Sequence, residues 1–197
     1  MRYSIDHTKS PGESLKFLVL KELEYIISQI ESKDQNMHKS IHEARKGFKK
    51  VRAMLRLIRD EIGYSSYYRE NVFYRDLSRN LSGIRTFRQH EACLRNLKKK
   101  MPDSIQDEKI NATVKQLKAQ RDEYLEEIKK RNVFSKTSNQ IKQAKQRILD
   151  FEITKNDFSL VEPGLRRMFR QGKKYYNACL QDPSTENLHN LRKRVKY

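Results

Sequence analysis

The chain has 197 residues, and its 43 Lys and Arg against 25 Asp and Glu give a formal net charge of +18 at pH 7. The length predicts one domain, and the charge predicts a polyanionic partner. No run approaches the roughly 20 apolar residues of a membrane-spanning helix, and the N-terminus lacks the pattern of a secretory signal peptide. Cys93 and Cys179 are too few for a disulfide framework or a zinc site, so we expect buried thiols in a cytoplasmic protein.

The sequence predicts long helices and no strands. Its six glycines and four prolines are few, and most lie where a helical pattern breaks. Between the breaks apolar residues recur three and four positions apart, as at Leu15, Val19, Leu23, Ile26 and Ile30. The predicted fold class is therefore all-α, with helices expected over residues 13–32, 37–61, 66–100, 105–131, 135–152, 158–181 and 184–197.

The second predicted helix has an apolar face and a basic face. On a helix that turns about 100° per residue, the apolar side chains between Ile41 and Arg59 gather on one side and the cations on the other. The apolar face consists of Ala44, Phe48, Val51, Met54, Leu55 and Ile58. The basic stripe consists of His42, Arg45, Lys46, Lys49, Arg52, Arg56 and Arg59.

Almost no acidic residue interrupts this basic stripe. Like charges at i, i+4 on a helix repel by about 0.2–0.5 kcal/mol per pair, and a bound anion would relieve that repulsion. A solvated basic face is the other interpretation, and the stripe alone does not decide between the two.

The last predicted helix repeats part of the stripe at a constant offset. His42 and His189 lie 147 residues apart, and the Arg and two Lys that follow each histidine keep the same spacing. These residues are Arg45, Lys46 and Lys49 in the first copy and Arg192, Lys193 and Lys196 in the second. The preceding helices also match in outline, since one follows Pro11-Gly12 and the other Pro163-Gly164. The repetition predicts two similar half-bundles.

Two such helices, related by pseudo-symmetry, would line a groove with cations from both sides. A groove of one charge sign concentrates the electrostatic field. Arg offers forked donors for phosphate oxygens, Lys offers a mobile point charge, and His donates from a ring nitrogen. This chemistry suits a ligand with repeated phosphates.

Three segments resemble the CHAD domain, an α-helical family named for its histidines and associated with binding inorganic polyphosphate. The first is the histidine motif that starts at His42 and continues to Arg56. The second is the stretch of spaced arginines over residues 75–85, in which Thr86 follows Arg85 where the family commonly has Asp. The third covers residues 164–174 and leads into the motif at His189.

The resemblance implies one domain over residues 1–197, built as a helical bundle of two pseudo-repeated halves with long antiparallel helices. Residues 1–152 are expected to form the first half-bundle and residues 158–197 the start of the second. The second half is expected to be incomplete, because its motif ends at Tyr197 whereas the first continues into another long helix.

The resemblance also implies non-catalytic binding of inorganic polyphosphate in the groove between the two motif helices. We expect no enzyme activity, no cofactor and no membrane partner, and a cytoplasmic location that includes association with polyphosphate granules. The residues expected to bind polyphosphate are His42, Arg45, Lys46, Lys49, Arg52, Arg56, Arg75, Arg79, Arg85, Arg166, Arg170, Lys173, Lys174, His189, Arg192, Lys193 and Lys196.

Two other interpretations concern the histidines. His38 and His42 stand at i, i+4 as a metal-binding pair would, but the neighbouring cations disfavour a dication and no third ligand is spaced nearby. A phosphoryl group on His42 or His189 would need a donor site, and the chain has no Gly-rich phosphate loop or paired-carboxylate metal site. We therefore expect neither a metal site nor catalysis.

Other ligand classes fit the basic surface less specifically. Sequence-independent RNA or DNA binding is the main alternative, because counterion release favours any nucleic acid on such a surface. The aromatic residues before the arginines could stack bases, but their helical spacing favours core and rim packing. These residues are Tyr64, Tyr67, Tyr68, Phe73 and Tyr74. An acidic protein partner is a third class, and a membrane surface fits worse because the bundle core needs the apolar faces.

Overall fold

The computed structural model describes residues 8–32, 37–101 and 106–196, without the side chains of His38, Ile84, Arg85, Arg88 and Lys196. This part of the chain contains helices and connecting turns and no strand, which confirms the predicted all-α fold class. The helices are α1 (Pro11–Glu31), α2 (Met37–Leu57), α3 (Arg59–Ile62), α4 (Tyr64–Asn80), α5 (Gly83–Lys100), α6 (Asp107–Lys130), α7 (Val133–Leu149), the short 3₁₀ helix η1 (Phe158–Leu160), α8 (Glu162–Gln181) and α9 (Thr185–Lys196).

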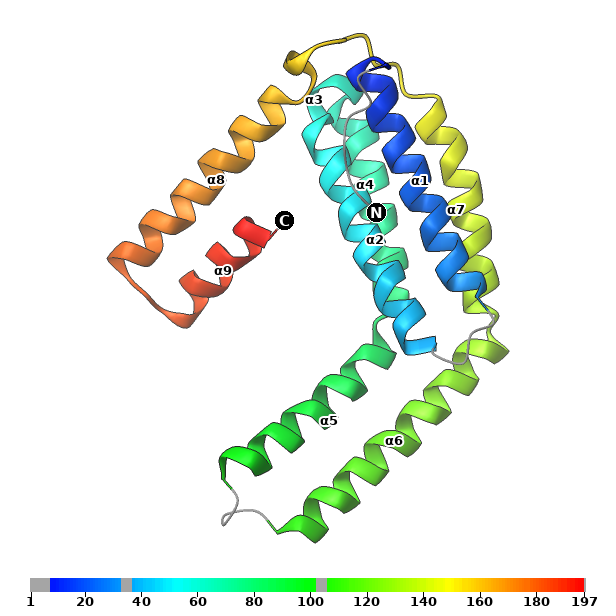
Figure 1. Cartoon of the computed structure of the whole chain (residues 1–197), viewed down its shortest axis with the longest axis vertical. Coiled ribbons are helices and arrows are strands. Elements are labelled where there is room, and N and C mark those ends of the chain that lie inside the picture. The colour runs from blue at the N-terminus through cyan, green and yellow to red at the C-terminus, as the bar shows by residue number, and fades with distance from the viewer. Residues whose placement is uncertain (1–7, 33–36, 102–105, 197) are drawn as a thin grey trace.

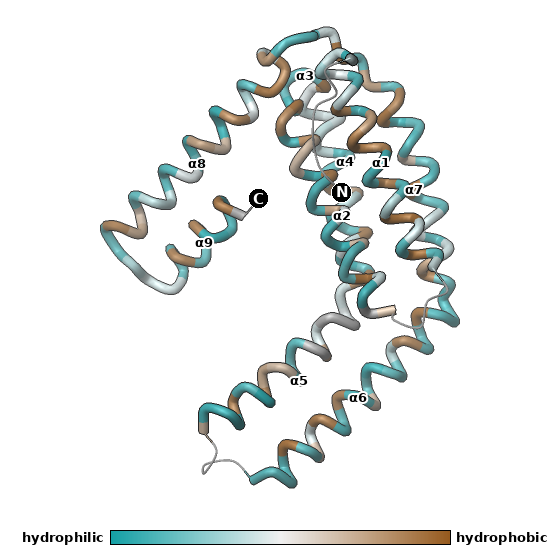
Figure 2. The backbone as a smooth tube through the Cα atoms, in the orientation of Figure 1, coloured by the Kyte–Doolittle hydropathy of each residue, from teal (hydrophilic) through white to brown (hydrophobic). Residues whose placement is uncertain are grey.

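Four helices, α1, α2, α4 and α7, lie side by side in a bundle (Figure 1). Helix α1 packs on both α2 and α7, and α2 packs on α4. Two hairpins extend from this bundle: α5–α6 from one end, and α8–α9 from the end where α7 finishes, with the last turns of α9 pointing back toward α2 (Figure 1). Hydrophilic and hydrophobic residues alternate along the helices, as expected for amphipathic helices packed in a bundle (Figure 2).

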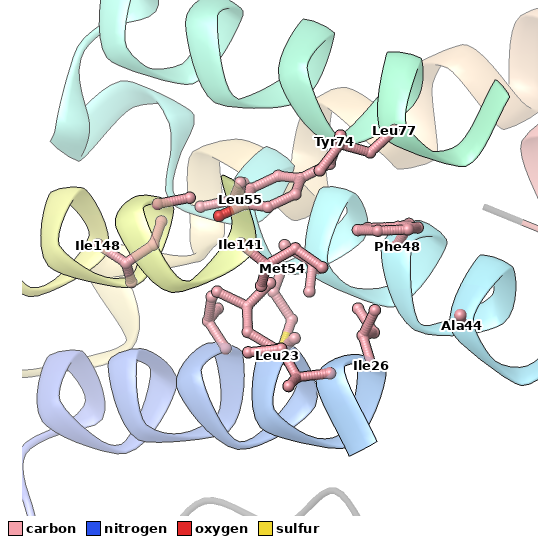
Figure 3. Close-up of a cluster of buried hydrophobic side chains, with 14 of the residues drawn as sticks. Leu23, Ile26, Ala44, Phe48, Met54, Leu55, Tyr74, Leu77, Ile141 and Ile148 are labelled. Atoms are coloured by element: carbon pink, nitrogen blue, oxygen red, sulfur yellow. The ribbon is translucent and has the colours of Figure 1, made fainter. Parts of the chain in front are cut away.

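The core lies between the four bundled helices (Figure 3). Leu23 and Ile26 of α1 and Ile141 of α7 have no solvent exposure, and they surround the apolar face of α2. The predicted apolar face of this helix is confirmed, because Ala44, Phe48, Val51, Met54, Leu55 and Ile58 are all buried. The ring of Phe48 stacks on that of buried Tyr74 in α4, with centroids 6.2 Å apart. Since the apolar face of α2 is committed to the core, its basic stripe must face outward.

Two predicted helices are broken in the structure. The helix expected over residues 37–61 ends at Leu57, and a separate short helix, α3, follows. The helix expected over residues 66–100 is interrupted at Leu81 and Ser82, where both the backbone N–H and the hydroxyl of Ser82 donate to the carbonyl of Arg79. This local hydrogen bonding competes with the helical pattern. It also lets α5 turn away from α4 into the projecting hairpin (Figure 1).

Buried ion pairs fix the bundle helices to one another. Glu70 of α4 is fully buried and accepts two hydrogen bonds from Arg147 of α7, at 2.7 and 3.0 Å. Glu22 of α1 is equally buried and lies 3.3 Å from the ammonium of Lys50 in α2. Charges buried in this way need a partner, so these two cations serve the fold.

The expectation that both cysteines are buried is wrong for Cys93 and only partly met by Cys179. Cys93 on the projecting hairpin is exposed, whereas Cys179 in α8 is half-buried. Cys93 is exposed because α5 packs on α6 alone over most of its length and leaves its other faces to solvent.

We expect the connection between α7 and α8 to loosen in acid, because Glu61 holds it. The Glu61 carboxylate accepts hydrogen bonds from the backbone and hydroxyl of Thr154 and from the backbone N–H of Lys155, at 2.7, 2.8 and 3.1 Å. Burial opposes ionisation of Glu61, but these hydrogen bonds outweigh it and lower the pKa from 4.5 to about 2. The resulting stabilisation is complete above about pH 4.5 and is lost as the pH falls toward 2.

Thermal unfolding measured across this pH range tests the role of Glu61. The midpoint of the Glu61→Gln variant should depend less on pH between about 4.5 and 2 than that of the wild type. Identical pH profiles for the two proteins would show that Glu61 does not carry this dependence.

Candidate anion-binding groove

A groove with a volume of about 490 Å³ lies between α2, α4 and the α8–α9 hairpin. Its walls come from helices far apart in the sequence, with the α2 and α4 residues on one side and the hairpin residues on the other. The lining residues are Arg45, Lys49, Arg52, Ala53, Arg56, Arg75, Ser78, Arg79, Met168, Gln171, Lys193 and Arg194. Among the residues that the structure describes, no Asp or Glu lines this groove.

Helical spacing places the cations of the first wall in two rows. In α2, Arg45, Lys49, Arg52 and Arg56 are four, three and four residues apart, so they share one half-buried face of the helix, beside its core face. This row spans about 16 Å, at about 1.5 Å rise per residue. In α4, Arg75 and Arg79 are four residues apart and form the second row.

Two arginines of α2 are oriented by neutral acceptors on α4. Arg45 donates to the carbonyl of Ser78 at 2.5 Å, and Arg52 donates to the side-chain oxygen of Asn71 at 2.9 Å. The Ser78 carbonyl belongs to the last turn of α4, where helix carbonyls lack partners within the helix. Because these acceptors carry no formal charge, they position the guanidinium groups without neutralising them.

The α4 arginines are only partly neutralised. Asp76 lies 2.8 Å from Arg75 and 3.5 Å from Arg79. These ion pairs are exposed, and exposed pairs contribute about 0–1 kcal/mol each. A multivalent anion can therefore compete with Asp76 for both arginines.

The cations of the groove lie close enough together to repel one another. Burial is the first cause that lowers the pKa of the Arg52 guanidinium, and repulsion from Arg56, Arg75 and Arg79 adds to it, while Tyr67 opposes the shift. The repulsion among these arginines disfavours one more positive charge and favours an anion, whereas burial penalises the charged form of Arg52 itself.

The opposite wall holds its cations through contacts within the α8–α9 hairpin. Arg194 of α9 donates to the side-chain oxygen of Gln171 in α8 at 3.0 Å, and its guanidinium lies 5.1 Å from the ring centre of Tyr175. A hydrogen bond from Arg194, helped by the charges of Arg194, Lys174 and Lys193, lowers the pKa of Tyr175. The hairpin thus presents Lys193 and Arg194 to the groove as one unit.

Gly164 allows α8 to approach the end of α2 closely. A Cβ atom at this position would lie 2.2 Å from the carbonyl oxygen of Leu57 and 2.7 Å from its Cα, so only glycine fits. Beside it, Arg167 donates two hydrogen bonds to Asp60, at 3.1 and 2.8 Å. This contact sets the position of the hairpin wall.

The structure brings seven of the predicted binding residues to the groove and leaves eight outside its lining. The seven are Arg45, Lys49, Arg52, Arg56, Arg75, Arg79 and Lys193. His42, Lys46, Lys173, Lys174, His189 and Arg192 do not line it, and Arg166 and Arg170 line a neighbouring cavity on α8. The side chains of Arg85 and Lys196 lie outside the described residues.

The two copies of the histidine motif do not contribute equivalent residues. Lys193 lines the groove, but Lys46, its counterpart 147 residues earlier, points to solvent and pairs with Glu43 at 3.0 Å. Neither His42 nor His189 is among the lining residues, although both are exposed. The groove cations are therefore mainly arginines of α2 and α4.

Sequence reasoning missed Arg194. Its counterpart in the repeat is Gly47, which packs against Ile26 and carries no charge, so the repeat gave no reason to include it. The run of cations from Arg192 to Arg194 could have identified it. Three consecutive basic residues on a helix cover most of its circumference, so at least one of them faces any groove beside the helix.

The described residues contain no cluster of three or more His, Cys, Asp or Glu side chains that could hold a metal ion. Across the same residues, none of the helices has the length and apolar character needed to span a membrane. The groove itself offers positive charge and hydrogen-bond donors.

Comparison with known proteins identifies the family. A profile of the CHAD domain matches residues 21–197, nearly the whole chain. No curated protein and no solved structure gives a significant match. On the strength of the match over residues 21–197, the chain belongs to the CHAD domain family.

Proposed function

We propose that this protein binds inorganic polyphosphate in the groove between α2, α4 and the α8–α9 hairpin, without chemistry of its own. The CHAD family is associated with polyphosphate binding in general. The observation that carries the proposal is the groove's composition: eight Arg and Lys side chains, and no carboxylate among the described residues that line it. A linear chain of phosphates matches two rows of cations better than a single compact anion does.

The binding residues in this proposal are those that the groove collects. Arg45 and Arg52 supply guanidinium groups pre-oriented by Ser78 and Asn71, so less side-chain freedom is lost on binding. The remaining contacts come from Lys49, Arg56, Arg75, Arg79, Lys193 and Arg194. The other residues expected to bind polyphosphate stay predictions: His42, Lys46, Arg85, Arg166, Arg170, Lys173, Lys174, His189, Arg192 and Lys196.

A salt series tests this function. Long-chain polyphosphate is titrated into the protein by calorimetry at several salt concentrations. We expect the logarithm of the binding constant to fall steeply and linearly with the logarithm of the salt concentration, because each neutralised phosphate releases counterions. Affinity that is absent at low salt, or independent of salt, would contradict the proposal.

Single-stranded RNA is the second candidate ligand, favoured by one observation. Tyr64 and Tyr68 of α4 are 65% and 55% exposed, and their rings stack with centroids 6.0 Å apart. Tyr68 is close enough to Arg75 in the groove to influence its pKa, which the adjacent Asp76 raises. Exposed stacked rings beside cations can hold bases, whereas polyphosphate has none. The other aromatic residues of this cluster, Tyr67, Phe73 and Tyr74, pack in or against the core.

A further inference from the structure

A second basic cavity is lined by residues from the end of α4, the end of α6 and the start of α7. These parts of the three helices lie at one end of the bundle (Figure 1). The volume of this cavity is about 560 Å³. Arg79, Arg131 and Lys136 contribute cations to its lining, and Asn80 and Gln140 contribute amides. Glu127 is the one carboxylate among the described residues that line it, so the lining carries a positive excess.

We propose that a polyphosphate chain longer than the groove continues past Arg79 into this second cavity. The inference rests on the proposed function and extends it to a preference for long chains. Arg79 lines both cavities, and its side chain is 68% exposed. Its guanidinium carries five N–H donors, enough to contact phosphates on either side at once.

The cations of the second cavity are available to a phosphate. Arg131 pairs with Glu127 at 2.5 Å, but the two side chains are 70% and 49% exposed. An exposed i, i+4 pair of this kind contributes about 0.3–0.5 kcal/mol, so a polyanion can displace the carboxylate. Lys136 is also exposed, one turn into α7.

The opposite end of the groove is less suited to bind the rest of a long polyphosphate chain. The cavity there shares Gln171 with the groove, and this neutral side chain already accepts a hydrogen bond from Arg194. Of the three arginines that line that cavity, Arg167 pairs with Asp60 and Arg166 with Glu162, at 2.8 and 2.6 Å, and the third is Arg170. Among the described residues, Arg79 is therefore the cation that the groove shares with a neighbouring cavity, whereas the residue shared at the other end is neutral.

Joining two sites on one ligand raises affinity without new contacts in the first site. Once the groove holds part of a chain, the rest of that chain reaches the second cavity at a high effective concentration. A short ligand such as tripolyphosphate binds within the groove alone and gains nothing from the second cavity. Because of the second cavity, the protein should therefore bind long chains more tightly than short ones.

The test uses the Arg131→Glu/Lys136→Glu double variant with two ligands, tripolyphosphate and long-chain polyphosphate. We expect the affinity for the long chain to fall roughly tenfold and the affinity for tripolyphosphate to stay within a factor of about two. The matched control is Lys115→Glu/Lys118→Glu on α6, which changes the net charge equally at exposed residues outside both cavities. It should leave the ratio of the two affinities unchanged.

Two results would overturn the proposal that the second cavity binds long polyphosphate chains. One is an equal loss for both ligands in the Arg131→Glu/Lys136→Glu variant, which indicates general electrostatics; the other is no loss for the long chain. Since Arg131→Glu places a second acid one turn from Glu127, the Arg131→Gln/Lys136→Gln variant repeats the test without this repulsion and should show the same selective loss. If the wild type binds no polyphosphate, the proposed function itself fails, and that result is distinct from both.

Discussion

Reversing one charge on each wall of the groove, in the Lys49→Glu/Lys193→Glu variant, is expected to lower the affinity for polyphosphate by about 100-fold or more. Lys49 belongs to α2 and Lys193 to α9, so the two substitutions place carboxylates on opposite sides of the bound chain. A tenfold loss of affinity at each position corresponds to about 1.4 kcal/mol of binding free energy. This is a modest change for a substitution that replaces attraction of the phosphates by repulsion. Calorimetric titration with long-chain polyphosphate at low salt measures the loss.

The Lys115→Glu/Lys118→Glu variant is the matched control for this experiment. It lowers the net charge by the same four units, at exposed positions on the projecting α5–α6 hairpin. Its affinity should fall by no more than severalfold, because charges outside the groove act only through the screened field of the whole molecule. Equal losses in the two variants would mean that a diffuse basic surface binds the polymer and the groove has no special role.

Adding a single methyl group, in the Gly164→Ala variant, is expected to weaken polyphosphate binding roughly tenfold, because the hairpin wall must move. The new Cβ would meet the backbone of Leu57 at 2.2 Å, and a backbone cannot rotate away as a side chain can. Overpacking of this kind lowers the free energy of unfolding by about 1–3 kcal/mol. The displacement carries Lys193 and Arg194 away from α2, so thermal unfolding and polyphosphate titration should both report the change.

Gly172→Ala in the same helix is the control for Gly164→Ala. No atom lies within 4 Å of a Cβ at this position. Alanine favours a helix interior over glycine by about 1 kcal/mol, so this variant should be slightly more stable and should bind polyphosphate normally. If Gly164→Ala behaves like Gly172→Ala, the contact with Leu57 does not set the groove.

The sequence predicted the orientation of α2 because that prediction depends only on helical geometry. Apolar residues at helical spacing have to enter the core, and Phe48, Val51 and Leu55 do so. Their burial forces Arg45, Lys49, Arg52 and Arg56 onto the outer face, whatever the neighbouring helices are. The first wall of the groove could therefore be predicted before any tertiary structure was known.

The break between α4 and α5 was not predictable in the same way. A helical pattern continues through Leu81 and Ser82, and the interruption depends on Ser82 bonding to the carbonyl of Arg79. Gly83, the first residue of α5, also lies close to the ring of Tyr124, 41 positions further along the chain: a Cβ at Gly83 would meet that ring at 2.4 Å. Local spacing carries no information about such a distant contact.

The second wall was predicted in outline and not in detail. The repeat of the histidine motif drew attention to the last helix, and it offered Arg192 and Lys193 as equivalents of Arg45 and Lys46. In the structure α9 meets the groove with Lys193 and Arg194 instead. The rotation of α9 is set by its packing on α8, through Arg194 with Gln171 and Tyr175, and a sequence repeat does not encode it.

A competition titration tests the central claim, that the groove is built for a chain of phosphates. The protein is bound to fluorescent single-stranded RNA or to double-stranded DNA, and long-chain polyphosphate is added at matched phosphate concentration and at several salt concentrations. Polyphosphate is expected to displace both nucleic acids at every salt concentration, because the closely spaced cations of α2 and α4 match its charge density and make no use of bases. Polyphosphate that fails to displace either nucleic acid at matched charge would contradict the account.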